Sequence, residues 1–229
     1  MEYLPNNFTL ELPEGTFPLS TDSMVLSHFV KLPKNAKVLD LGSGCGTLAL
    51  LLCAKDPRCT VTGLELDETA HAAALQNIRR NGLEPRLESI CADLRVFPES
   101  IVPGSFTTCV SNPPYFTGGP ASLATPLARR DDCCAPEDLF RSAAAALKFG
   151  GDFYVVHKPE KLAQLIGCGA AVSLEAKRLR LVRHKEGGPI TTVLLHFRKG
   201  AKPGLIIDEL SLFDSQGNST EARREIYHI

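Results

Sequence analysis

The stretch AKVLDLGSGCG, residues 36–46, decides the fold of this chain. Its first six residues form a short, nearly all-apolar run, which is typical of a strand buried on both faces of a sheet. Glycines then stand at alternate positions, and residues 47–55 continue as a helix. Glycines spaced in this way let the backbone turn sharply and let a ligand approach main-chain N–H groups. The stretch therefore predicts a strand, a ligand-binding turn and a helix in succession.

Strand-like and helix-like segments alternate onward from this stretch. The expected strands are residues 36–41, 60–66, 86–91, 106–111, 152–157, 175–183 and 191–198, and the expected helices are residues 24–30, 47–55, 69–81, 136–149 and 159–167. Such alternation requires right-handed crossovers and a parallel sheet with helices on both faces. The last two strands are joined by the turn Gly187-Gly188-Pro189, so we expect them to be antiparallel neighbours. The predicted class is α/β, with a seven-stranded, mostly parallel sheet and one antiparallel C-terminal strand.

The length of 229 residues, 44% of them hydrophobic, suits a single domain with a full core. We expect an N-terminal lead-in and cap helix over residues 1–35 and the main domain over residues 36–200. Residues 201–229 form a tail whose apolar stretch GLIIDELSLF predicts packing on that domain.

Membrane and secretory features are absent from the sequence. No run of about 18 apolar residues occurs, and the N-terminus lacks the basic start and apolar stretch of a secretory signal. Eight cysteines are scattered without C-x-x-C pairs. We therefore expect a cytoplasmic protein with free thiols, no membrane association and no metal site.

The acid before the glycines indicates which ligand binds there. The segment reads Asp40-Leu-Gly42-Ser-Gly44-Cys-Gly46, whereas a dinucleotide fingerprint has the spacing G-x-G-x-x-G. A carboxylate at this place repels a phosphate but suits a cofactor that carries an ammonium group. The charge therefore favours S-adenosylmethionine over NAD.

Further polar residues at the ends of the next strands complete the predicted cofactor site. Glu65 lies 19 positions after Gly46, where an acid can bind both hydroxyls of a ribose. Asp93 follows the third strand and could accept a hydrogen bond from the adenine amino group, although a turn cap explains it nearly as well. Leu66 and Thr21 are assigned to the same site.

The segment Asn112-Pro113-Pro114-Tyr115 follows the fourth strand and predicts the chemistry. Two prolines fix the backbone and remove two donors, which leaves the Asn112 side chain and the Pro113 carbonyl as acceptors. Two convergent acceptors can hold the hydrogens of an amino group and direct its lone pair toward a methyl donor. Tyr115 offers a ring for stacking, and Phe116 beside it is a further substrate-binding candidate. As an alternative, the same tetrapeptide could be only a rigid turn.

Together these residues resemble the Rossmann-like class I methyltransferases that modify an exocyclic or amide nitrogen. Thr21-Asp22-Ser23 and the C-terminal stretch EARREIY, Glu221–Tyr227, are similar to the bacterial tRNA (adenine-N6)-methyltransferases that act beside the anticodon of a valine tRNA. The resemblance implies S-adenosylmethionine as cofactor, tRNA as partner, a monomeric catalytic core, and a target adenine flipped against Tyr115.

The charge distribution is relevant to an RNA substrate. The formal net charge is −1, yet residues 172–202 carry eight basic and two acidic side chains. Arg178 and Arg180 alternate with leucines, so one face of that strand is cationic and could follow an RNA backbone. A charged edge that discourages pairing between sheets is an equal alternative. Arg129 and Arg130, in the loop after Tyr115, are further substrate-binding candidates.

Other substrates and classes remain open at this level. A protein-glutamine N5-methyltransferase also uses such a segment but usually carries an N-terminal helical domain, and guanine-N2 rRNA enzymes often have a duplicated domain. A non-catalytic cofactor-binding or RNA-binding module is the alternative of another class, and the intact Asn112 and Tyr115 argue against it.

Overall fold

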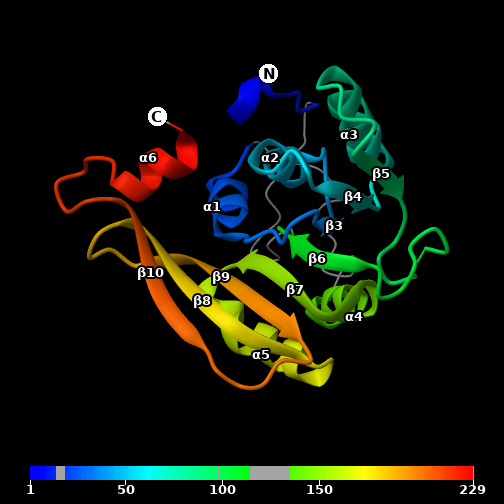
Figure 1. The fold of residues 1–229 in the computed structure, drawn as a ribbon. Helices are drawn as coiled ribbons and strands as arrows, with labels where there is room; N and C mark the ends of the chain where they lie inside the picture. The colour runs from blue at the N-terminus through cyan, green and yellow to red at the C-terminus, as the bar shows by residue number, and fades with distance from the viewer. Residues whose placement is uncertain (14–18, 97, 114–134, 229) are drawn as a thin grey trace, which may run out of the picture.

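An eight-stranded sheet forms the centre of the computed structural model, which describes residues 1–13, 19–96, 98–113 and 135–228. The strand order is β10-β8-β9-β7-β6-β3-β4-β5 (Figure 1). Their bounds are β3 Lys37–Leu41, β4 Thr60–Glu65, β5 Leu87–Cys91, β6 Phe106–Ser111, β7 Leu147–His157, β8 Leu174–Lys185, β9 Ile190–Lys199 and β10 Ile206–Phe213. Strand β9 is antiparallel to both of its neighbours, and all other pairs in the sheet are parallel. The α/β class and the single antiparallel strand are confirmed.

The predicted count of seven strands is wrong by one. The apolar tail stretch forms β10, which pairs in parallel with β8 from Ile206 opposite Arg178 to Phe213 opposite Lys185. Hydrophobicity predicted that this stretch docks, but pairing with a strand about 28 residues earlier is a long-range event that local pattern does not show. The tail therefore extends the sheet.

The helix expected over residues 136–149 is also shorter than predicted. Helix α4 spans Pro136–Ala146, and Leu147 already pairs with Phe106 at the start of β7. Gly150 has a φ of +74°, so the left-handed turn that suggested a helix end lies inside an irregular strand start. Pairing with β6 therefore outweighs the helical pattern from Leu147 onward.

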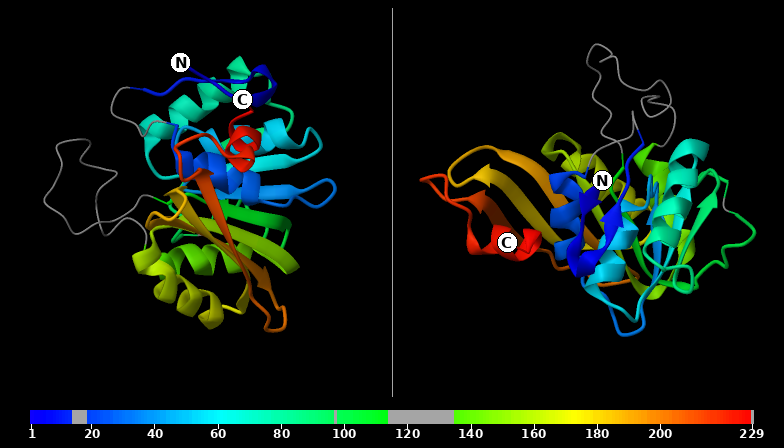
Figure 2. Two further views of the ribbon diagram at one scale, coloured as in Figure 1. Left: turned by 90° about the vertical axis from the view of Figure 1, so that its left-hand side faces the viewer. Right: turned by 90° about the horizontal axis from the view of Figure 1, so that it is seen from above.

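Helices cover both faces of the sheet (Figures 1 and 2). Helices α1 (Thr21–Phe29), α2 (Thr47–Lys55) and α3 (Glu68–Arg80) share one apolar core, while α4 and α5 (Leu162–Ala171) share the other. Helix α6 (Glu221–Tyr227) packs against β10 and α1. None of the described helices is long and apolar enough to cross a membrane.

The N-terminal segment is anchored on α3. Strands β1 (Glu2–Tyr3) and β2 (Thr9–Leu10) flank the short 3-10 helix η1 (Pro5–Asn7), and a second one, η2 (Pro159–Lys161), follows β7. The Asn81 side chain accepts from and donates to the backbone of Thr9, both at 2.8 Å. The expected lead-in thus contains a small antiparallel pair held by side-chain amides.

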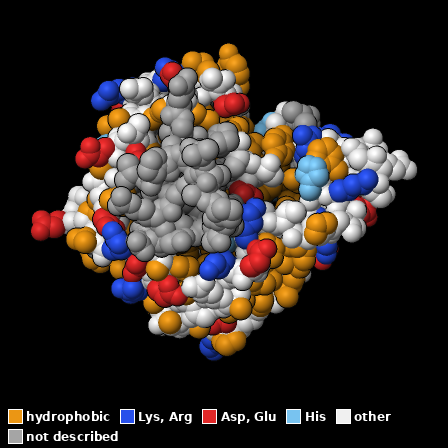
Figure 3. Space-filling model, turned by 180° about the vertical axis from the view of Figure 1, so that it is seen from behind, with side chains coloured by type: hydrophobic (Ala, Val, Ile, Leu, Met, Phe, Trp, Pro, Cys, Tyr) orange, Lys and Arg blue, Asp and Glu red, His pale blue; other side chains and the backbone are white. Residues whose placement is uncertain are grey.

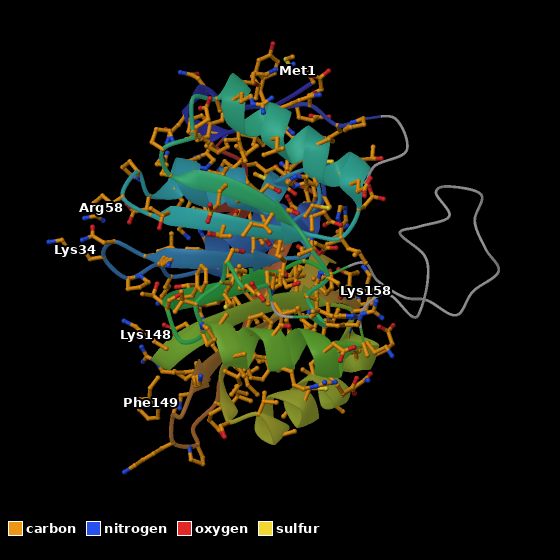
Figure 4. All side chains as sticks on the ribbon, turned by 90° about the vertical axis from the view of Figure 1, so that its right-hand side faces the viewer. Met1, Lys34, Arg58, Lys148, Phe149 and Lys158 are labelled. Atoms are coloured by element: carbon orange, nitrogen blue, oxygen red, sulfur yellow. The ribbon has the colours of Figure 1, made fainter. Side chains whose placement is uncertain are left out.

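Parallel strands bring their carboxyl ends to one edge of the sheet. Lys158, which follows β7, lies at that edge, whereas Lys34 and Arg58, which precede β3 and β4, lie on the opposite side together with Lys148 (Figure 4). Open sheets bind ligands at the carboxyl edge. The segments after β3, β4, β5 and β6 all meet there.

Candidate active site

The glycine-rich turn between β3 and α2 is open and lies in the left-handed backbone region. Gly42, Gly44 and Gly46 have φ values of +73°, +55° and +85°. A Cβ at Gly42 or Gly44 would meet no described atom within 4 Å, so a ligand can approach this backbone directly. The Gly42 and Ser43 N–H groups both donate to Leu64 O, at 2.9 and 3.1 Å, which fixes the turn against β4. The glycines therefore occupy the sharp turn that the sequence predicted, in a backbone conformation that other residues rarely adopt.

Asp40 lies beneath this turn and is almost completely buried, with 1% of its surface exposed. Burial and the charge of Glu65 raise the pKa of Asp40 to about 7, and a hydrogen bond from the Ala49 backbone opposes this only in part. Its Oδ2 atom has no hydrogen-bond partner among the described residues. An unpartnered buried carboxylate oxygen is costly unless a cationic or donor group completes it. Asp40 therefore has a buried oxygen that can still accept a hydrogen bond, and its predicted contact with a cofactor ammonium stays a prediction.

Glu65, the last residue of β4, forms the wall of the turn. Its Oε2 accepts from Gly44 N at 2.7 Å and its Oε1 accepts from Asp67 N at 2.8 Å. A carboxylate has about four acceptor positions, so both oxygens keep capacity for further donors. Leu66 beside it is 47% exposed and offers an apolar surface at the same edge.

The two aspartates that follow have separate local partners. Asp67 caps α3 by accepting from Ala70 N at 2.8 Å. Asp93 pairs with Arg95, with 2.6 Å between the Oδ2 and Nη2 atoms, and this pairing lowers the pKa of Asp93. The Arg95 side chain and backbone N–H already occupy much of the hydrogen-bonding capacity of the Asp93 carboxylate. A contact between Asp93 and adenine stays a prediction.

Asn112 follows β6 and is held by the start of α1. Its Nδ2 donates to Ser23 Oγ at 2.9 Å and lies 3.4 Å from Ser20 Oγ. Ser20 also caps α1 by accepting from Ser23 N at 3.2 Å. Because the amide nitrogen faces α1, the Oδ1 oxygen is oriented as the acceptor end of the group. The sequence analysis missed this role of the serines, since they lie about 90 residues before Asn112.

The first turn of α1 is fixed from two further directions. Tyr227 of α6 donates its hydroxyl to Thr21 Oγ1 at 3.2 Å, and Thr192 of β9 donates to Asp22 Oδ1 at 3.0 Å. The Thr21-Asp22-Ser23 stretch and the C-terminal stretch, which sequence resemblance singled out separately, are thus in contact. Thr21 directly follows Ser20, the cap residue whose hydroxyl lies 3.4 Å from the Asn112 amide nitrogen. A contact between Thr21 and the cofactor stays a prediction.

Several predicted residues lie outside the described part of the chain. Pro113 is half-buried next to Asn112. The remaining candidates of this loop fall among residues that the structure does not describe: Pro114, Tyr115, Phe116, Arg129 and Arg130.

The two arginines of the basic strand have intramolecular partners. Arg178 and Arg180 both form ion pairs with Asp208 of β10. Their guanidinium carbons also lie 4.9 and 5.5 Å from the centre of the Phe29 ring. The expected cationic face is therefore partly neutralised by its neighbour strand, and a role of these arginines in RNA contact stays a prediction.

His157 ends β7 beside the Asn112 segment. Its side chain is largely buried, and its Nδ1 accepts from Lys158 N at 2.8 Å. Burial and the charges of Lys161 and Lys158 lower its pKa to about 4. His157 is therefore neutral near pH 7 and adds no positive charge to this edge.

The chain is similar to known proteins in sequence and in fold. The family model described as methyltransferase small domain matches residues 20–167. A protein of Bacteroides fragilis named tRNA1(Val) (adenine(37)-N6)-methyltransferase is 30% identical, with 96% of this chain and 94% of that protein covered. A protein of the same name from Photobacterium profundum is 27% identical and covers 77% of this chain and 75% of its own. Among solved structures, a predicted O-methyltransferase from Agrobacterium tumefaciens superposes with a TM-score of 0.74 at 19% identity, covering 91% of this chain and 96% of that one.

Proposed function

Since the chain belongs to the methyltransferase small domain family, we propose that it transfers a methyl group from S-adenosylmethionine to the N6 amino group of an adenine in tRNA. The observation that carries this proposal is the position of Asn112. Its amide is held by α1 at the carboxyl edge, after a strand that is paired directly with the strand bearing Asp40. This pairing supports the proposal, because the segment proposed to hold the target amino group and the turn proposed to hold the methyl donor follow neighbouring strands.

The residues at the glycine-rich turn fit S-adenosylmethionine. The buried, unpartnered Oδ2 of Asp40 suits the ammonium of its amino-acid part, and the exposed backbone at Gly42 and Gly44 leaves room for that part. Glu65 would bind the ribose hydroxyls with its remaining acceptor capacity, and Leu66 would pack on the adenine. Asp93 and Thr21 are proposed as further contacts. When bound, the cofactor supplies an electrophilic methyl group on sulfonium.

The protein's contribution to the reaction is orientation. The Oδ1 of Asn112 and the carbonyl of Pro113 accept the two hydrogens of the target amino group, so that the nitrogen lone pair points at the methyl donor. Holding both reactants in line replaces a bimolecular encounter, and such alignment contributes several kcal/mol to catalysis, on the order of 7–11 in the best intramolecular cases. No strong base is needed, because the product ammonium loses its proton readily. Pro114 would keep the segment rigid, and Tyr115 and Phe116 would stack on the flipped base.

RNA is favoured over protein as substrate because the relatives named for adenine-N6 methylation align over nearly the whole chain. Arg129, Arg130, Arg178 and Arg180 are proposed to support RNA binding through phosphate contacts. We further propose that the enzyme acts as a monomer in the cytoplasm.

Methyl transfer from labelled S-adenosylmethionine tests this function. The purified protein is incubated separately with total tRNA and with total protein from a strain that lacks the gene. We expect label in tRNA, recovered as N6-methyladenosine after digestion to nucleosides. Label in protein, or in guanosine, would refute the adenine assignment in favour of the glutamine or guanine-N2 alternative.

A further inference from the structure

A stacked column of ring and guanidinium groups lies beyond the first turn of α1. Its members are His184 at the end of β8, Phe213 at the end of β10, and Arg223 and Tyr227 of α6. The His184 and Phe213 ring centres are 4.8 Å apart, with planes tilted by 45°. The Arg223 guanidinium lies 4.6 Å from the Phe213 ring centre and 5.0 Å from that of Tyr227. We call this set the stacked column.

The stacked column is connected to the candidate active site by hydrogen bonds. Tyr227, at one end of the column, donates to Thr21, and the cap residue just before Thr21 lies 3.4 Å from the Asn112 amide. Strands β8 and β10 both end at the carboxyl edge of the sheet, because they are parallel to each other and to β7. The column therefore lies on the same edge as the proposed amino clamp, on the side of α1 and α6.

The other end of the column is open to solvent. His184 is exposed, while Phe213, Arg223 and Tyr227 are half-buried. Figure 3 shows this edge: to the right of the grey residues, a lobe formed by the β8–β9 hairpin and the segment between β10 and α6 carries histidine, basic and apolar side chains together. An exposed imidazole on a supported ring is an unused stacking surface.

The column is also preformed. Glu186 N donates to Phe213 O at 2.9 Å and Ser215 N donates to Glu186 Oε2 at 3.2 Å, which joins the hairpin tip to the segment after β10. Thr220 caps α6 by accepting from Arg223 N at 3.2 Å. Rigid rings lose little entropy when a ligand stacks on them, so preformation favours binding.

We propose that the stacked column is a docking site for unpaired nucleotides of the RNA substrate that flank the methylated base. The inference rests on the proposed function. Proteins read single-stranded RNA by stacking its bases on Phe, Tyr and His rings and on Arg planes, and a column of this composition has that chemistry. The surrounding charge is mixed, because Glu209 pairs with Arg183 and Asp214 directly follows Phe213, so stacking rather than phosphate attraction is the expected source of affinity here.

The test uses the full-length protein with an anticodon stem-loop transcript of valine tRNA and the variants His184→Ala, His184→Phe and Lys185→Ala. Binding is measured at several salt concentrations, together with kcat and KM for methyl transfer. We expect His184→Ala to weaken binding and raise KM about 5- to 150-fold, as for the loss of one stacked base, with kcat and the salt dependence unchanged. His184→Phe keeps a ring and should stay within about twofold of wild type. Lys185→Ala, the matched control, removes an exposed neighbouring side chain outside the column, and RNA affinity should stay within about twofold of wild type, because stacking rather than phosphate attraction supplies the affinity here.

Two results would overturn the inference: RNA affinity of His184→Ala equal to that of wild type, or equal weakening in His184→Ala and His184→Phe. Both are read against a wild-type protein that methylates the transcript. If wild type itself neither binds nor methylates any tRNA, the proposed function fails, and that failure is seen before any variant is compared.

Discussion

Cofactor affinity should depend on pH through Asp40. The pKa of Asp40 is raised to about 7 by burial and by the charge of Glu65, so its carboxyl group is mostly protonated at pH 6 in the unliganded protein. A cofactor ammonium requires the ionised form, and binding below the pKa therefore releases a proton. Affinity for S-adenosylhomocysteine should fall about tenfold for each pH unit below about 7 and level off above it.

The variant Asp40→Asn removes this ionisation while keeping the shape of the side chain. A lost charged hydrogen bond is worth about 1.5–3 kcal/mol, so affinity near pH 7.5 should fall roughly ten- to a hundredfold. Below about pH 6 the two proteins should converge, because wild type is then mostly neutral at this position. Isothermal titration between about pH 5 and 7.5 measures both curves, with Asp138→Asn, at a half-buried residue of α4 that pairs with Arg141, as control. A wild-type affinity independent of pH, or a slope that persists in Asp40→Asn, would refute the reasoning.

The raised pKa of Asp40 also makes the free energy of unfolding depend on pH. The folded-state pKa of Asp40 lies above its ordinary value of 3.8, so the folded protein binds more protons than the unfolded chain between about pH 4 and 7. The contribution of Asp40 to stability is fully present below about pH 4 and is lost as the pH rises through 7. The difference between the two values corresponds to on the order of 4 kcal/mol at 1.36 kcal/mol per pKa unit. Comparing the free energies of unfolding of wild type and Asp40→Asn across this window isolates the effect from other titrating groups.

Three other predictions concern substrate binding and the edge of the sheet. Asn112→Ala should reduce kcat by about a hundredfold or more with nearly unchanged S-adenosylhomocysteine affinity, because its amide contacts the substrate and not the cofactor. Near-normal tRNA methylation by this variant would show that the Asn112–Tyr115 segment is only a rigid turn. Tyr115→Ala should cost about 1–3 kcal/mol in kcat/KM from lost stacking, whereas Tyr115→Phe keeps the ring face and should be mild; equal losses in steady-state kinetics would contradict a stacking role. Replacing Arg178 and Arg180 together by Gln should lower the melting temperature, because Asp208 loses both partners. A weaker salt dependence of RNA binding in that double variant would support the predicted phosphate contacts of the two arginines. An unchanged salt dependence would mean that these arginines only stabilise the fold.

Local sequence patterns determined the features whose causes lie within a few residues. The strand before Gly42 and the helix after Gly46 follow from apolar runs, and the glycines occupy left-handed backbone that other residues rarely adopt. The capping of α3 by Asp67 is equally local, since its partner is three residues away. The alternation of strands and helices was sufficient to predict the parallel sheet, and the short turn Gly187-Gly188-Pro189 to predict its antiparallel strand.

Tertiary structure alone decided the features that join distant segments. The pairing of β10 with β8, and the ion pairs of Arg178 and Arg180 with Asp208, depend on residues about 30 positions apart. The hold of Ser23 on Asn112 spans 89 positions, and the contact of Tyr227 with Thr21 spans 206. The sequence marked Asp40 as an acid near a ligand, but its raised pKa comes from complete burial beside Glu65. Burial and long-range pairing are properties of the packed chain, because water exclusion and hydrogen-bond partners are set by whichever segments meet, and spacing along the sequence does not reveal which ones do.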